Sequence, residues 1–517
     1  MNYQVVSAAE FTYPDIREYN SSSRDINISV ARGSYASCHI LLDGLRSSEI
    51  QVSAAGFEGG EFYTLMPIFV ENTYNIKKEN YREHYPEREA PYYIYDCYRP
   101  FNGSLILTDG FGGLYFSLRI DKSADVGLIK GSVKIKCADK AIEIPVRIEV
   151  FKAVVPDTNI SLINGYSIGS YYNYKGITPT PSEYAAMDQK SMAKLRRARQ
   201  NMMYVGGVKV IEKDDGSCDF DFTALEALME KYEKNGFTRF FGPSVGWRKS
   251  WSESTILING KIPAMSFEAY KYLTQYLPKL QKMLSAHGWN DRFVLGVADE
   301  PNAPNSTEYR ALCGMIKKIA PDIRLADAMS WGQNVPGGVD VCIPLNSEFE
   351  AHIDEFSYIR DQGVELWHYV CCGPRHDGYT NRFMDYPLLS SQYLFWGNYK
   401  YKLTGYLHWA SMHYQPKQNP FVSNIPTHRN TDSVCLLPPG DTHIIYPGDD
   451  EPWMSARLEA QRRGQEEFEL LKLIGANNRE KADSLCEAGF RKFNNVEYDI
   501  NKYTALHREI LTAASEL

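Results

Sequence analysis

The stretch FVLGVADEP at residues 293–301 decides the fold, because it carries both a structural and a chemical signal. Residues 293–298 bear no polar side chain, which is typical of a strand buried on both faces. Asp299 and Glu300 follow at once, and Pro301 ends the strand because it lacks the N–H that a strand ladder needs. A buried strand of this kind followed by an amphipathic helix is the building unit of parallel α/β proteins.

The strand-and-helix unit repeats through the second part of the chain. We predict strands at residues 161–169, 202–205, 239–242, 293–298, 324–328, 341–345, 365–370 and 405–409. We predict helices at residues 183–199, 222–234, 267–284, 307–319, 354–361, 388–401, 455–474 and 503–514. The alternation requires parallel strands with crossover helices, and eight units predict a (β/α)8 TIM barrel. An open doubly wound sheet is the alternative, but no glycine-rich phosphate loop follows the first strand.

The first 150 residues show a different pattern, in which apolar and mostly polar residues alternate. Residues 142–150 alternate in this way, residues 114–120 and 132–137 behave similarly, and glycines lie between them. Strands with one apolar face in series predict a β-sandwich. The predicted fold class is therefore α/β, a TIM barrel preceded by an N-terminal β-sandwich. The expected parts are a β-sandwich at 1–155, the barrel at 156–480 and a helical extension packed on the barrel at 481–517.

Composition excludes several classes of protein. The net charge is −8 and no Lys/Arg stripe is present, so no nucleic-acid partner is expected. No apolar run of about 18 residues and no N-terminal signal pattern occurs, which predicts a cytoplasmic protein without a membrane span. The ten scattered cysteines are typical of free thiols. The aromatic content of 13% fits either aromatic-rich cores or a sugar-binding surface.

Asp299 and Glu300 lie where a barrel keeps its functional groups, at the carboxyl end of the fourth strand. The neighbouring pair favours glycoside hydrolysis in which the 2-acetamido oxygen of the sugar attacks the anomeric carbon. In this scheme Asp299 orients the acetamide and stabilises its charged nitrogen, while Glu300 acts as general acid and then general base. A separate nucleophile is not expected, because Glu365 is the only carboxylate of the seventh strand and lies at its start, the wrong end.

Four further residues are candidates for substrate binding. Trp409 ends the eighth strand and is placed to stack on a sugar ring, although it could equally fill the barrel. Tyr369 is placed to bind the acetamide carbonyl, and a core tyrosine is the alternative. Asn381 and Arg375, in the loop after the seventh strand, are candidate contacts to sugar hydroxyls.

The side chains of His368, Cys371, Cys372 and His376, in or after the seventh strand, are of the types that bind metals, but their pattern does not favour a metal site. His368 and Cys371 point to opposite faces of a strand, and the neighbouring Cys371 and Cys372 are poor chelators. We therefore predict no metal and no cofactor. The proline-rich loop at 414–440, together with Trp247 and Trp251, is expected to close a pocket around a terminal sugar.

Five motifs carry a resemblance to a known family: LGVADEP at 295–301, WHYVCC at 367–372, GYLHW at 405–409, YPG at 446–448 and SARLE at 455–459. The chain resembles glycoside hydrolase family 123, the exo-acting β-N-acetylgalactosaminidases. The resemblance implies a β-sandwich followed by a barrel, with Asp299 as the acetamide-stabilising residue and Glu300 as the acid/base. The chain departs from the family at His408, where a tyrosine normally precedes the tryptophan.

The expected function is that of a retaining exo-glycoside hydrolase acting on a glycan or glycoconjugate. It removes terminal β-linked N-acetylhexosamine through an oxazolinium intermediate, and the resemblance implies N-acetylgalactosamine. Two alternatives stay open, together with the oligomeric state. One is a glycosidase of the same fold that acts on a sugar without the acetamide and uses Asp327 or Glu348 as a further carboxylate. The other is a non-catalytic carbohydrate-binding protein, which has no need of an acid.

Overall fold

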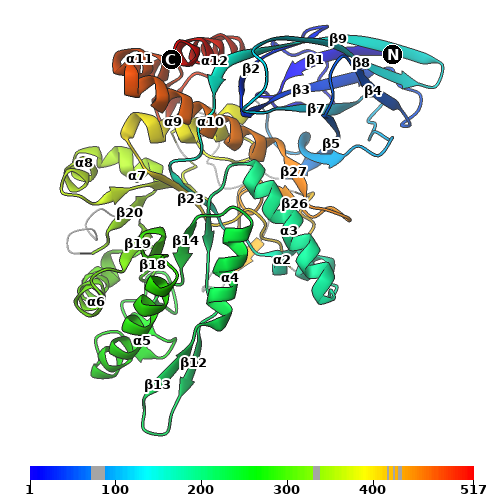
Figure 1. Ribbon diagram of the computed structural model, residues 1–517. Helices are drawn as coiled ribbons and strands as arrows, with labels where there is room; N and C mark the ends of the chain where they lie inside the picture. The colour runs from blue at the N-terminus through cyan, green and yellow to red at the C-terminus, as the bar shows by residue number, and fades with distance from the viewer. Residues whose placement is uncertain (72–87, 330–337, 376, 416–417, 423–425, 429–433) are drawn as a thin grey trace.

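The N-terminal part of the chain is built from strands, in agreement with its alternating sequence pattern. The computed structural model describes residues 1–517 apart from 72–87, 330–337, 376, 416–417, 423–425 and 429–433. One sheet has the strand order β1-β3-β7-β5-β6-β27-β26 and the other has the order β2-β9-β8-β4 (Figure 1). The strands are β1 (Asn2–Ser7), β2 (Ile26–Arg32), β3 (Ser34–Asp43), β4 (Gln51–Ala55), β5 (Gly60–Val70), β6 (Tyr92–Pro100), β7 (Gly112–Ile120), β8 (Gly127–Cys137), β9 (Lys140–Val154), β26 (Ile445–Tyr446) and β27 (Trp453–Ser455).

These two sheets share one apolar core, because alternation sends one face of each strand inward. Ile40 and Phe116 of the first sheet lie in the same buried cluster as Val133 and Ile148 of the second. Lysines occupy the alternate, exposed positions of β8. The expected strand-rich N-terminal part is therefore present.

Two strands of the first sheet come from far along the sequence. β27 pairs with β6, with Met454 opposite Tyr98 and Ser455 opposite Cys97, and β26 pairs with β27. Their residues lie within the range at which the sequence predicts the barrel. The chain thus returns to the N-terminal sheet after the eighth parallel strand, and α10 (Ala456–Asn477) starts from there.

All eight predicted parallel strands form, but they belong to two sheets. One contains β11 (Met202–Tyr204), β14 (Arg239–Gly242), β18 (Phe293–Gly296), β19 (Arg324–Met329), β20 (Val341–Pro344) and β21 (Glu365–Leu366), in this order. The other has the order β10 (Ser161–Asn164), β23 (Gly405–His408), β22 (His368–Tyr369). β21 and β22 are consecutive pieces of one segment, so the two sheets meet there. The described strands therefore do not form the single closed sheet of the expected TIM barrel.

The interruption between β10 and β11 has a clear cause in two buried side chains. The Oδ1 atom of Asn201 accepts from the N–H of Leu162 at 2.9 Å, and its Nδ2 donates to the carbonyl of Ile160 at 2.8 Å. The amide of Gln200 makes the equivalent pair with the main chain of Asn164, at 3.1 Å each. Side-chain amides thus make most of the hydrogen bonds at this seam, beside one backbone bond in which the N–H of Asn201 donates to the carbonyl of Leu162 at 3.3 Å.

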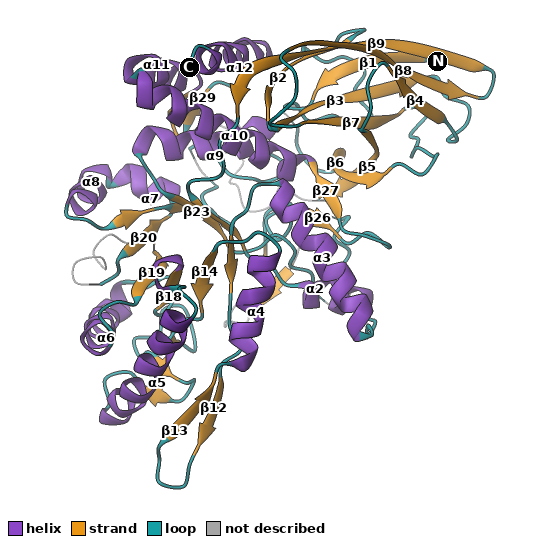
Figure 2. Ribbon diagram, viewed as in Figure 1, coloured by secondary structure: helices purple, strands orange, loops and turns teal. Residues whose placement is uncertain are grey.

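Helices pack around these sheets, as Figure 2 shows. The helices are α2 (Ile168–Lys175), α3 (Pro181–Arg197), α4 (Thr223–Lys234), α5 (Phe267–Ala286), α6 (Ser306–Ile319), α7 (Asn346–Ala351), α8 (Ile353–Asp361), α9 (Leu388–Tyr401), α10, α11 (Arg479–Gly489) and α12 (Ile500–Ser515). Sequence signals set several starts: Thr180 and Glu183 form a capping box at α3, and Ser266 caps α5. The predicted helices agree with these bounds to within a few residues.

Short strands lie outside the main sheets. β12 (Lys209–Glu212) and β13 (Cys218–Asp221) form a protruding hairpin (Figure 1), and β15 (Gly246–Trp247), β16 (Leu257–Ile258) and β17 (Ile262–Pro263) form a small sheet. Two further pairs are β24 (Pro426–His428) with β25 (Val434–Leu436), and β28 (Phe490–Lys492) with β29 (Asn495–Val496).

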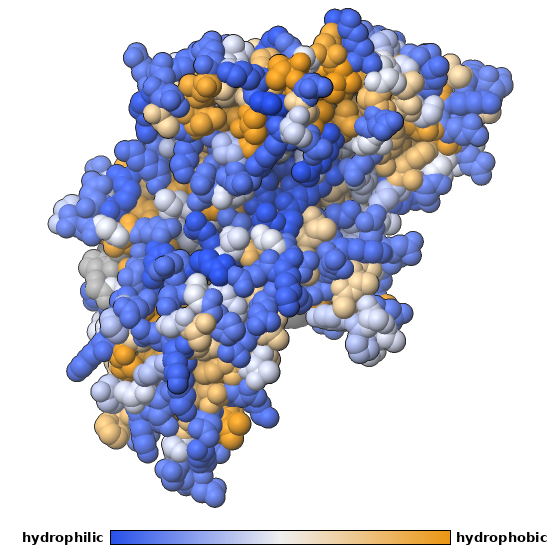
Figure 3. Space-filling model, viewed as in Figure 1, coloured by the Kyte–Doolittle hydropathy of each residue, from blue (hydrophilic) through white to orange (hydrophobic). Residues whose placement is uncertain are grey.

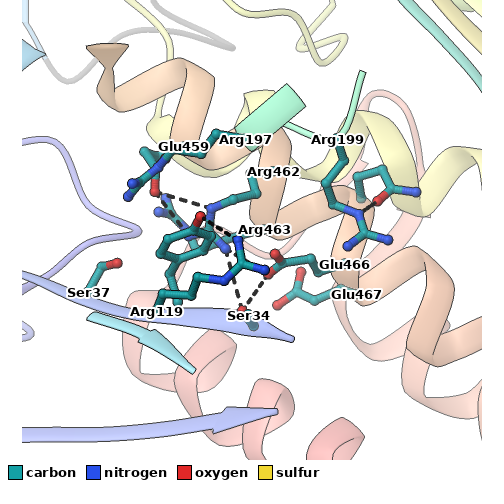
Figure 4. Close-up of polar contacts among 12 residues, drawn as sticks. Ser34, Ser37, Arg119, Arg197, Arg199, Glu459, Arg462, Arg463, Glu466 and Glu467 are labelled. Atoms are coloured by element: carbon teal, nitrogen blue, oxygen red, sulfur yellow. Dashed lines mark hydrogen bonds and ion pairs between the residues drawn. The ribbon is translucent and has the colours of Figure 1, made fainter. Parts of the chain in front are cut away.

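Helix α10 joins the two parts of the protein through a buried ionic cluster (Figure 4). Glu459 accepts from Arg197 of α3 at 2.8 Å and from Arg462 at 3.1 Å. Glu466 accepts from Arg462 at 2.7 Å and from Ser34 of β3 at 2.6 Å. Burial alone would raise the pKa of Glu459, but Arg197 and Arg462 outweigh it and hold that pKa well below its usual range.

The viewed surface is mostly hydrophilic, and hydrophobic residues gather where the strand-rich part meets α12 (Figure 3). A cavity of about 510 Å³ lies between β1, β2 and β3 on one side and α10 and α12 on the other. It is distant in the fold from the carboxyl ends of the parallel strands. Among the described residues, no helix combines the length and apolarity needed to cross a bilayer.

Candidate active site

A cavity of about 580 Å³ opens at the carboxyl ends of the parallel strands. Strands β11, β14, β18, β19, β22 and β23, or the loops directly after them, contribute to its wall. The polar and aromatic residues that matter most are Asp299, Glu300, Asp327, Tyr369, Trp409 and Asp441. Four of the six predicted site residues therefore meet in one cavity.

An unusual backbone turn brings Asp299 and Glu300 into the same cavity. Both residues adopt left-handed conformations, with φ of 43° and 40°. Two consecutive non-glycine residues in this region cost on the order of 1–3 kcal/mol each, and such strain is concentrated at functional sites. The turn cancels the strand alternation that would send neighbouring side chains to opposite faces. The N–H of Glu300 donates to the carbonyl of Ala328 at 3.0 Å and ties the turn to β19.

Arg248, from the segment after β14, holds this turn from the other side. Its Nη2 donates to the carbonyl oxygens of both Asp299 and Glu300, the second at 3.2 Å. Burial lowers the pKa of Arg248, whereas the charges of Asp299 and Asp327 act in the opposite direction. The guanidinium therefore lies in the field of the site's carboxylates.

The two acids have different surroundings. The side chain of Asp299 is exposed to water in the cavity, but the surrounding protein still desolvates it in part. This desolvation and the charge of Glu300 raise the pKa of Asp299 to about 6, whereas the positive charge of Arg248 acts to lower it. Glu300 is half-buried, and its Oε1 accepts from the hydroxyl of Tyr369 at 2.9 Å. Tyr369 thus contacts the predicted acid/base in this structure.

A third carboxyl group, Asp327 of β19, supports the end of β18. Its Oδ2 accepts from the N–H groups of Val297 and Ala298 at 3.1 and 2.9 Å, and from the hydroxyl of Tyr309 at 2.9 Å. Burial, followed by the charge of Asp299, raises the pKa of Asp327 to about 7. The other rival carboxylate, Glu348, lies in α7 and does not line the cavity.

Trp409 and Asp441 form the opposite wall. The indole Nε1 of Trp409 donates to Oδ2 of the fully buried Asp441 at 3.2 Å. Burial, then Cys372, raises the pKa of Asp441 to about 7. The N–H of Ala410 donates to Nδ1 of His408, so the ring proton is on Nε2, which lies 3.2 Å from Oδ1 of Asp441 without hydrogen-bond geometry.

Residues 170–474 match the model described as glycoside hydrolase 123, catalytic domain. This range is more than half of the chain and contains all of the cavity's acids. The chain belongs to glycoside hydrolase family 123.

One solved structure has a similar fold over the whole chain, and weaker matches are found to other glycosidases. A family 123 glycoside hydrolase from Clostridium perfringens, described for glycolipid glycan hydrolysis, matches with a TM-score of 0.74 at 13% identity, over 100% of this chain and 97% of that one. A termite-gut GH10 xylanase with an Ig-like domain has a TM-score of 0.35 at 9% identity, over 86% and 100%. A β-glucuronidase from Parabacteroides merdae has a TM-score of 0.33 at 11% identity, over 85% and 50%. No curated protein sequence matches.

Two predicted residues of this family 123 hydrolase do not line the cavity. Asn381 is fully buried, and its Nδ2 donates to the carbonyls of Cys371, Gly373 and Pro374 at 3.0–3.3 Å. Arg375 donates to the carbonyl of Cys372. Both brace the loop that carries Cys371 and Cys372 in the cavity wall, so their predicted contacts to sugar hydroxyls stay predictions.

Two residues at this site, Arg248 and Asp441, were not predicted from the sequence. Arg248 lies about fifty residues before the acids and has no motif of its own. The only sequence signal at Asp441 is its place directly after the long loop that follows the eighth strand, and this does not by itself assign it to the site. Residues 416–417, 423–425 and 429–433 of that loop, and His376, lie outside the described residues. In the described ranges, no group of three or more His, Cys, Asp or Glu side chains has the arrangement of a metal site.

Proposed function

We propose that this family 123 hydrolase is a retaining exo-enzyme that removes terminal β-linked N-acetylhexosamine, N-acetylgalactosamine first of all. The observation that carries the proposal is the double left-handed turn, which turns Asp299 and Glu300 toward one cavity. The Clostridium perfringens relative was described for glycolipid glycans, and we propose glycans of glycoconjugates as the substrate class here.

The acids would divide the chemistry as follows. Protonated Glu300 donates its proton to the glycosidic oxygen as the bond to the anomeric carbon breaks. The acetamide oxygen forms the new bond to that carbon, and the Asp299 carboxylate stabilises the charged nitrogen of the oxazolinium. Glu300, now ionised, takes a proton from a water molecule. That water attacks the anomeric carbon from the face that the leaving group has left and opens the oxazolinium, which gives retention of configuration. Intramolecular attack of this kind is worth roughly 7–11 kcal/mol when well oriented.

The properties of the other two carboxyl groups of the cavity, Asp327 and Asp441, favour the acetamide oxygen of the substrate as the nucleophile over a carboxylate of the protein. A nucleophilic carboxylate has to be ionised. The raised pKa values of Asp327 and Asp441, about 7 for each, leave each carboxyl group only about half ionised at neutral pH. Asp327 is also occupied with three hydrogen bonds that hold the end of β18.

We also propose that the two parallel sheets act together as the eight strands of a (β/α)8 barrel, closed at one seam by Gln200 and Asn201. The division at 1–155, 156–480 and 481–517 is retained as a proposal. The strands at 445–455 are an addition to the first part, since they pair with its sheet.

The test is an assay with aryl β-glycosides of N-acetylgalactosamine, N-acetylglucosamine and galactose. We expect turnover of the acetamido sugars only, and a loss of at least about a hundredfold in kcat for Glu300→Gln and Asp299→Asn. Equal turnover of the galactoside would refute the internal nucleophile. Absence of turnover for every glycoside, with retained sugar binding, would favour a binding protein.

A further inference from the structure

Two tryptophans beside the acids are unusually exposed. Trp247 and Trp251 leave 53% and 54% of their surface open to solvent, whereas Trp289, Trp367 and Trp396 are fully buried. Tryptophan has a large apolar surface, so leaving two of them open in one short segment is unfavourable unless a ligand covers them.

The backbone that carries these tryptophans is fixed along the turn of the acids. The N–H groups of Val245 and Gly246 donate to the carbonyls of Gly296 and Val297 at 3.0 and 2.7 Å. The buried side chain of Asn302 donates to the carbonyl of Trp251 at 2.6 Å. Between the two tryptophans, Arg248 binds the carbonyls of both acids. The backbone that carries the two exposed rings is therefore held at a defined place.

That place is next to the cavity but outside it. Neither Trp247 nor Trp251 lines the cavity, whose own aromatic wall includes Trp409 and Tyr369. An exo-enzyme buries the terminal sugar, and its general acid must lie at the leaving oxygen. The rest of the glycan must therefore extend out of the cavity past Glu300. Arg248, the neighbour of Trp247 in the sequence, donates to the backbone carbonyl of Glu300.

We propose that Trp247 and Trp251 form a stacking platform for the sugar rings on the leaving-group side of the scissile bond. The preferred substrates are then oligosaccharides with at least one further pyranose behind the terminal sugar. Pyranose faces stack on indole rings, and a tryptophan on a fixed backbone has few side-chain torsions to immobilise on binding. The inference rests on the proposed function, because the position of the leaving group is set by the role of Glu300 as general acid.

The test compares three soluble substrates with the same terminal sugar: a methyl β-glycoside, a disaccharide and a trisaccharide. Trp247→Ala and Trp251→Ala should each lower kcat/KM on the oligosaccharides about three- to tenfold, the value of one aromatic contact. The methyl glycoside has no ring on the leaving side, so its kcat/KM should stay within about twofold. Phenylalanine at either position should restore part of the loss.

The matched control is Tyr358→Ala, because this exposed aromatic residue lies in α8 and has 67% of its surface open. It should affect no substrate. Equal losses on the methyl glycoside, or no loss on any oligosaccharide, would overturn the platform. A loss confined to a glycolipid in phosphatidylcholine vesicles would also overturn it, and would assign the tryptophans to a membrane surface.

Calorimetry separates this inference from the proposed function. Glu300→Gln is titrated with the trisaccharide, alone and combined with Trp247→Ala or Trp251→Ala. Weaker binding of the combined variants supports the platform even if the wild type cleaves no glycoside, which would refute only the proposed function. Unchanged binding refutes the platform.

Discussion

Asp299 shows most clearly how one residue's surroundings set its chemistry. Partial desolvation and the charge of Glu300 raise its pKa to about 6, and its proposed role requires the anion. The wild-type kcat/KM should therefore increase as the pH increases through about 6, because deprotonation of the free enzyme produces the active form. Asp299→Asn should lose this acidic limb along with most of its activity. A limb that persists in the variant would assign it to another group.

Asp441 is the residue whose role only its contacts reveal. It accepts from Trp409 and lies beside His408, so its removal would release the ring expected to contact the sugar. Asp441→Ala should raise KM about tenfold for every substrate and change kcat less, while Asp441→Asn should recover part of the loss as an acceptor for the indole. Steady-state kinetics check this, with Asp215→Ala in the exposed β12–β13 turn as control. A lower kcat at unchanged KM would contradict it.

At the scale of elements, the seam between β10 and β11 depends on side chains. Asn201→Ala removes two hydrogen bonds and leaves the N–H of Leu162 and the carbonyl of Ile160 buried without these partners. We expect the free energy of unfolding to fall by roughly 2–4 kcal/mol, measured by urea denaturation. Asn27→Ala, on the exposed face of β2, is the control and should change little. If Asn201→Ala lowered the free energy of unfolding as little as Asn27→Ala does, the side-chain bonds at the seam would add no stability.

For the whole molecule, α10 is the connection between the strand-rich part and the parallel sheets. Glu459→Gln leaves Arg197 and Arg462 with a neutral partner in a buried place, so we expect a loss of about 3–5 kcal/mol at neutral pH. Because the folded pKa of Glu459 lies below the unfolded value, its contribution is complete above about pH 4.3 and is lost as the pH falls below that value.

The measurement for this prediction is the unfolding free energy as a function of pH. The wild type should lose stability more steeply than Glu459→Gln as the pH falls below about 4.3. Glu516→Gln, exposed at the C-terminal end, should follow the wild type. Parallel curves for Glu459→Gln and the wild type would contradict the account.

The sequence by itself determined the eight parallel strands, most of the helices, the strand-rich start and the position of Asp299 and Glu300. These features are local, because side-chain period and helix caps act over a few residues. The resemblance to family 123 was likewise carried by short motifs and is confirmed by the family model.

Tertiary structure alone decided which distant residues join the acids. Arg248 and Asp441 reach the site from other loops, Asn381 braces a loop instead of lining the cavity, and residues 445–455 return to the first sheet. It also decided that side-chain amides make most of the hydrogen bonds between β10 and the start of β11. Such contacts depend on how whole elements pack, and local sequence periodicity carries no information about pairings between segments far apart in the chain.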